Sequence, residues 1–162
     1  MIFYLKQRAE FLRYSHDVLS RATIGNEDDS DLRDREAIKE KMGGDLFKAS
    51  AVAETVLPPW NPLRLEINLI HGIFLFVYRS NFQHAIEHCT KVVSEATEAL
   101  KEGAVEDTVL FQEAEAALKK LNAFMKEIPE GDANTNQNND MNSMKEWLQT
   151  NMGFKPMWKY CK

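Results

Sequence analysis

The stretch LEINLIHGIFLFVY, residues 65–78, decides the fold class of this chain. Apolar residues fill most of its positions, and it holds one glycine and no proline. Pro58, Pro59 and Pro62 stand just before it, and proline removes a backbone donor and disfavours helical geometry in the residue that precedes it. We therefore predict a helix over residues 63–78 with most of its circumference buried in a core.

Helical periodicity continues on both sides of this segment, and only 5 prolines and 7 glycines interrupt the 162 residues. Upstream, the pattern predicts a helix over residues 2–22, a loop at GNEDDS (residues 25–30) and a helix over residues 32–56. Downstream, it predicts a helix over residues 82–101 that ends at Gly103 and a helix over residues 106–127 that ends before Pro129. Ser143 and Glu146 form a capping-box pattern, which predicts a short C-terminal helix.

The predicted fold class is therefore all-α, an antiparallel array of about five long helices and one short one. We expect one helical domain over residues 1–128 and an Asn-rich linker over residues 129–141. A tail over residues 142–162 contains Trp and Met residues and is basic. It carries Lys145, Lys155, Lys159 and Lys162 against the single acid Glu146.

Composition and charge narrow the function classes. With 44% hydrophobic and 28% charged residues the chain is globular in type, and its formal charge of −5 disfavours binding to nucleic acid. Two cysteines are too few for a disulfide framework. Charged residues interrupt the apolar residues at the start of the sequence, so no signal peptide is expected. No run approaches the roughly 20 apolar residues that a membrane span needs. We expect a soluble, cytoplasmic protein that does not bind membranes.

Lys6, Arg13 and Tyr14 form the first candidate binding site. Their spacing of seven and eight positions places them two turns apart on one helix face, where two cations and a phenol can converge on one anion. Arginine offers a fork of donors that matches phosphate oxygens, and tyrosine adds one O–H. The alternative is a surface ion-pair network, because Glu10 stands four residues after Lys6 and three before Arg13.

The residues HAIEH, with His84, Glu87 and His88, match the H-x-x-E-H pattern of one zinc peptidase class. Five residues are a weak match, and no third ligand is identifiable in the sequence. His71, in the most apolar segment, is interpreted as a hydrogen-bonded core residue. No nucleophile triad, glycine-rich phosphate loop or paired carboxylates stand out, so we expect neither an enzyme nor a bound metal or other cofactor.

Two stretches resemble the 14-3-3 family, the dimeric all-helical adaptors that bind phosphoserine and phosphothreonine peptides. They are FYLKQRAEFLRY, residues 3–14, and LPPWNPLRLEINLIHGIFLF, residues 57–76, in the order that the family has. The resemblance covers most of residues 2–125, but only the last five of the family's nine helices, so the chain is similar to the C-terminal half of a divergent or truncated member. It implies a phosphopeptide-binding adaptor in signalling, with phosphorylated proteins or peptides as its clients.

Carried over residue by residue, the resemblance places Arg13 and Tyr14 on the family's phosphate-binding pair and Lys6 on a nearby lysine. It places four residues on the apolar wall of the peptide groove: Leu69, Ile73, Val109 and Leu110. Two asparagines of that groove fall on Ile70 and Ala117, so the expected groove is degenerate. The alternative function is a helical protein-interaction scaffold that no longer reads phosphate.

The resemblance also bears on whether copies of this chain associate with one another. In the family, the second half packs against helices that would precede Met1, so we expect an uncovered apolar face on the first helix. A homo-oligomer is one way to cover such a face.

Overall fold

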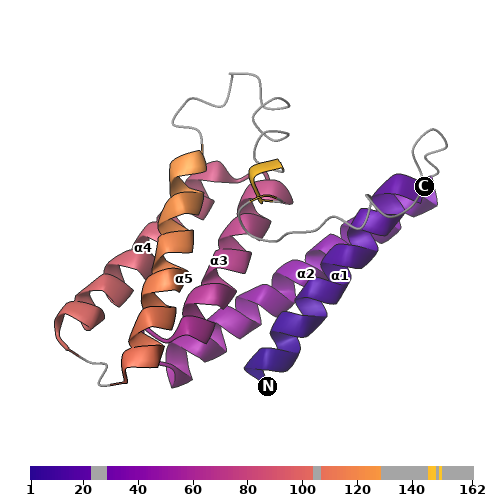
Figure 1. Ribbon diagram of the computed structural model, residues 1–162. Helices are drawn as coiled ribbons and strands as arrows, with labels where there is room; N and C mark the ends of the chain where they lie inside the picture. Colours follow the sequence, from indigo (N-terminus) through magenta and orange to yellow (C-terminus); the bar gives the residue numbers. More distant parts are fainter. Residues whose placement is uncertain (23–28, 104–106, 129–145, 149, 151–162) are drawn as a thin grey trace. The chain divides into compact units, whose positions relative to one another are not determined.

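The chain is all-α in the computed structural model, which describes residues 1–22, 29–103, 107–128, 146–148 and 150 (Figure 1). Five long helices follow one another: α1 (Ile2–Ala22), α2 (Asp29–Val56), α3 (Pro62–Val77), α4 (Phe82–Lys101) and α5 (Thr108–Glu127). Residues 146–148 are also helical, and no strand occurs among the residues described. The predicted fold class, with its short C-terminal helix, is confirmed. Ser143 and the linker at 129–141 lie outside the described residues.

The helix boundaries follow local chemistry. α1 and α4 have the predicted bounds, whereas α2 begins three residues earlier than expected, at Asp29. Acidic residues are favourable at a helix N-terminus, which explains why Asp29, expected in the loop, begins the helix and is followed there by Asp31. α3 begins at Pro62 because the Asn61 side chain accepts a hydrogen bond of 3.0 Å from the Leu63 N–H, and proline is well tolerated in the first turn.

The chain divides into two compact units, the first with the bounds Met1–Val52 and the second beginning at Ala53. The division falls inside the range that the sequence predicted as one domain, and the predicted bounds 1–128, 129–141 and 142–162 stay predictions.

In the first unit a two-point ion pair joins α1 to α2. Arg8 donates from Nε to Asp45 Oδ2 at 2.6 Å and from Nη2 to Asp45 Oδ1. Asp45 is buried, and so are Ala9 on α1 and Leu46 on α2. The paired carboxylate raises the pKa of Arg8, and a hydrogen bond with Tyr4 adds to the shift. A fork of two hydrogen bonds fixes orientation better than a single contact.

In the second unit α3 packs against both α4 and α5, which lie side by side with it (Figure 1). Phe76 of α3 and Phe124 of α5 are fully buried and meet edge to face, with ring centroids 6.2 Å apart. Leu65 and Ile67 of α3 are also fully buried. The prediction that residues 63–78 form a buried helix is therefore confirmed, with bounds one residue earlier at each end.

One buried cation fixes the start of α3. Arg64 donates from Nη1 to the Leu57 carbonyl oxygen at 3.1 Å and from Nη2 to Glu95 Oε2 on α4 at 2.8 Å. The Arg64 carbonyl in turn accepts a hydrogen bond of 2.8 Å from the buried Asn68 amide. These hydrogen bonds satisfy Nη1 and Nη2 of Arg64 and the Nδ2 group of Asn68, whereas Arg64 Nε and Asn68 Oδ1 are buried without a hydrogen-bond partner among the described residues.

Candidate functional site

Lys6, Arg13 and Tyr14 lie on α1, in the first unit. Lys6 and Arg13 are seven positions apart, which places them on nearly the same face at about 10.5 Å along the helix axis. Both residues are buried to the same degree, with 8% of their surface exposed, whereas Tyr14 is 36% exposed. The helix therefore holds two cations in a sheltered position beside an accessible phenol.

The guanidinium of Arg13 lies over the ring of Tyr14, with Cζ 4.3 Å from the ring centroid. A cation over an aromatic face is attracted to it, and the planar fork of arginine donates within its own plane. The contact with Tyr14 therefore helps to hold the Arg13 guanidinium in place. Asp17 Oδ2 lies 3.7 Å from Arg13 Nη1, which is longer than a hydrogen bond. Asp17, four residues after Arg13, is thus one carboxylate beside the guanidinium, and the alternative network through Glu10 stays a prediction.

The four predicted groove residues lie in the second unit. Leu69 and Ile73 stand one turn apart on α3, and both are buried. Val109 and Leu110 open α5 and are exposed. The structure thus gathers Lys6, Arg13 and Tyr14 on one helix and distributes the groove residues over two others. The groove role of the four residues stays a prediction.

The two histidines of the HAIEH segment differ in their surroundings. His88 faces His71 of α3, with ring centroids 4.6 Å apart, whereas His84 is exposed. Burial lowers the pKa of His71 to about 4, and the neighbouring His88 adds to this effect. Burial also lowers the pKa of His88. Among the residues that the structure describes, no three His, Cys, Asp or Glu side chains are grouped so that they could hold a metal ion.

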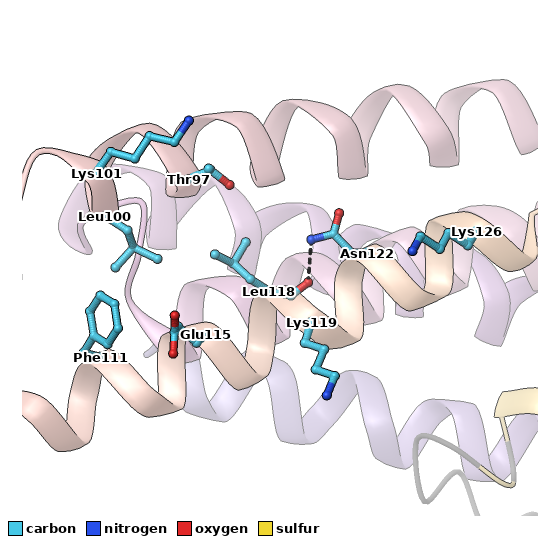
Figure 2. Close-up of a pocket in the computed structure, with 9 residues that line it drawn as sticks. All are labelled: Thr97, Leu100, Lys101, Phe111, Glu115, Leu118, Lys119, Asn122 and Lys126. Atoms are coloured by element: carbon cyan, nitrogen blue, oxygen red, sulfur yellow. Dashed lines mark hydrogen bonds between the residues drawn. The ribbon is translucent and has the colours of Figure 1, made fainter.

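Sequence reasoning missed an open groove between α4 and α5 with a volume of about 620 Å³ (Figure 2). Its lining combines apolar, basic and polar side chains: Thr97, Leu100, Lys101, Phe111, Glu115, Leu118, Lys119, Asn122 and Lys126. The sequence did contain one signal, since Phe111 with Leu118 and Lys119 with Lys126 both recur at seven positions on one helix. The neighbouring helix that completes the groove could not be read from that spacing.

Comparison of the chain with protein-family models gave no match, and comparison with curated proteins gave none. No helix in the described ranges is both long enough and apolar enough to cross a membrane.

Proposed function

We propose that this protein is an adaptor-like, phosphoserine- and phosphothreonine-peptide-binding protein that uses Lys6, Arg13 and Tyr14 to hold the phosphate. The observation that carries the proposal is the Arg13 guanidinium, stacked on Tyr14 and sharing a helix face with Lys6. The resemblance of residues 3–14 and 57–76 to the 14-3-3 family supports the same function.

The chemistry of the three groups suits a phosphorylated side chain. A phosphoserine carries a charge of about −1.5 to −2 at neutral pH and three acceptor oxygens. Arg13 can donate two parallel N–H bonds to two of these oxygens, Lys6 supplies a second positive charge, and the Tyr14 hydroxyl supplies an O–H donor. The phosphate must displace the ion pair between Arg13 and Asp17, and the net charge of −5 opposes its approach. We expect weak binding that falls with salt.

The test is a fluorescence polarisation titration of the full chain with a labelled phosphoserine peptide and with its unphosphorylated twin. We expect the phosphorylated peptide to bind more tightly. Arg13→Ala should abolish most of that difference, since a hydrogen bond to a charged group contributes about 1.5–3 kcal/mol, or roughly 10- to 100-fold in affinity.

The matched control is Arg33→Ala, which removes an exposed arginine of α2 in the same unit. It should leave the preference for the phosphorylated peptide unchanged. Equal binding of the two peptides by the unmodified chain would overturn the proposal.

A second function has one specific observation in its favour. Phe3, Tyr4 and Phe11 on α1 are 62%, 62% and 68% exposed, an unusual degree for aromatic side chains. Exposed aromatic residues are enriched at protein–protein interfaces. This surface supports a helical interaction scaffold that does not read phosphate, or self-association of the chain through α1.

Light scattering of the full chain separates these two uses of the surface. A dimer that Phe11→Ser converts to monomer would assign the aromatic surface to self-association. A monomer that binds phosphorylated and unphosphorylated partners equally well would assign the aromatic surface to the scaffold.

A further inference from the structure

We propose that the groove between α4 and α5 is a second binding site, which takes an acidic amphipathic peptide segment of a partner protein. The groove lies wholly within the second unit and shares no residue with Lys6, Arg13 and Tyr14. Its proposed ligand is recognised by charge and apolar contact and needs no phosphate.

The floor of the groove is apolar. Leu118 of α5 is buried, whereas Leu100 of α4 and Phe111 of α5 are half-buried, and the three lie between the two helices (Figure 2). Asn122 donates a hydrogen bond of 3.0 Å to the Leu118 carbonyl and lies beside this floor. Burial of the exposed parts of Leu100 and Phe111 favours the binding of a ligand that covers the floor.

The edges of the groove are basic. Lys101, Lys119 and Lys126 line it and are exposed, and within the described part of the chain none of the three forms an ion pair. Lys91 of α4, by contrast, pairs with Glu54 at 3.6 Å and with Glu95 at 3.8 Å. The groove has one acid, Glu115, against three lysines, on a chain whose net charge is −5.

Charge complementarity therefore selects an acidic occupant. Lys119 and Lys126 stand seven positions apart on α5, about 10.5 Å along the axis, so two carboxylates two helical turns apart on a bound helix match them. A helix laid into a groove uses apolar residues at spacings of three, four and seven, which here meet Leu100, Phe111 and Leu118. Residues 142–162 of the chain are basic and do not complement this surface.

The experiment uses the full chain and a fluorescein-labelled peptide of about three helical turns, with Leu and Phe at helical spacing and Glu elsewhere. Its twin carries Gln in place of every Glu. We expect saturable binding of the acidic peptide that weakens with salt and markedly weaker binding of the twin. Lys119→Gln and Lys126→Gln should each weaken binding by roughly two- to fivefold, the range of exposed ion pairs.

The matched control is Lys120→Gln, which changes an exposed lysine of α5 that does not line the groove. Its affinity should equal that of the unmodified chain. Phe111→Ala tests the floor independently and should weaken the binding of the acidic peptide and of its Gln twin alike. Thermal melting, monitored by circular dichroism, shows whether the variant is folded.

Two results would overturn the proposal. If Lys120→Gln weakens binding as much as Lys119→Gln and Lys126→Gln do, the attraction is diffuse and the groove is not the site. If the acidic peptide does not bind while the chain forms a dimer that Lys119→Gln dissociates, the occupant is a second copy of the chain and not a partner's acidic segment.

Discussion

Gly72 of α3 lies so close to Cys89 of α4 that a Cβ atom on Gly72 would stand 2.5 Å from the cysteine Sγ. The same Cβ would be 3.3 Å from Cε1 of Phe124 on α5. Glycine lowers helix stability relative to alanine, so its presence in the middle of α3 has a packing reason. Its missing side chain allows the three helices of the second unit to approach one another.

Gly72→Ala should therefore destabilise the protein. Overpacking a filled core costs typically about 1–3 kcal/mol, which exceeds the gain in helix propensity of roughly 0.5–1 kcal/mol. The midpoint of urea unfolding measures the change. Cys89→Ala introduced into the same chain removes Sγ and should recover part of the loss.

Gly44→Ala is the matched control, because Gly44 is also a helical glycine but a Cβ there meets no atom within 4 Å. This substitution should stabilise the chain by about 0.5–1 kcal/mol. If Gly72→Ala raised stability as Gly44→Ala does, the packing explanation would be wrong.

The half-buried pair His71 and His88 predicts a loss of stability in mild acid. The folded chain holds His71 with a pKa of about 4, whereas an unfolded histidine titrates near 6.5. Between these two values the unfolded state binds more protons, so the free energy of unfolding falls as the pH falls from about 6.5 to 4. For His71 the full loss is on the order of 3 kcal/mol.

Urea unfolding at a series of pH values measures this loss, and His71→Phe should flatten the curve within that window. The groups that face the pair also titrate or carry charge, namely His84 and Lys91 of α4 and Glu54 of α2. His84→Gln is the control, because His84 is exposed and its removal should leave most of the slope. An equal slope in His71→Phe would mean that other groups cause the acid sensitivity.

Arg64→Met should destabilise the second unit. The change keeps the apolar stem but removes the donors to the Leu57 carbonyl and to Glu95, at a cost of about 1.5–3 kcal/mol for hydrogen bonds that involve a charged group. Thermal melting of the full chain measures the effect. Glu95→Gln retains an acceptor for Arg64 and should cost less; an equal or greater cost would contradict this account.

In the proposed site Tyr14 has two roles, since its hydroxyl donates a hydrogen bond and its ring contacts Arg13, and two substitutions can separate these roles. Tyr14→Phe keeps the ring under Arg13 and removes the O–H, so phosphopeptide affinity should fall by roughly two- to tenfold, the value of one hydrogen bond. Tyr14→Leu also removes the stacked ring and should cost more. Titrations with the same phosphoserine peptide measure both changes, and equal losses would show that the stack does not orient Arg13.

Much of the fold could be predicted from the sequence because its signals are local. Proline at 58, 59 and 62 locates the start of α3 to within one residue, and Gly103, which has a φ of +73°, ends the helical run of α4 as predicted. The start of α2 was misplaced because the prediction began at the first apolar residue, whereas the acidic residues before it already belong to the helix.

The candidate sites also differ in whether the sequence could predict them. Lys6, Arg13 and Tyr14 share one helix, so their spacing alone predicts that they share a face. The groove between α4 and α5 and the contact between His71 and His88 each join residues of different helices. Such contacts depend on how helices pack, which the periodicity of one helix does not determine.

Because Cys89 is buried, the rate at which a thiol reagent labels it can report how often the second unit opens. The Cys89 side chain is shielded from solvent, and burial raises the pKa of the thiol to about 12, so hardly any reactive thiolate exists in the closed state. In a chain with Cys161→Ser, a thiol reagent should label Cys89 only when α3, α4 and α5 separate. The labelling rate then reports how often they do so, and Gly72→Ala should increase it.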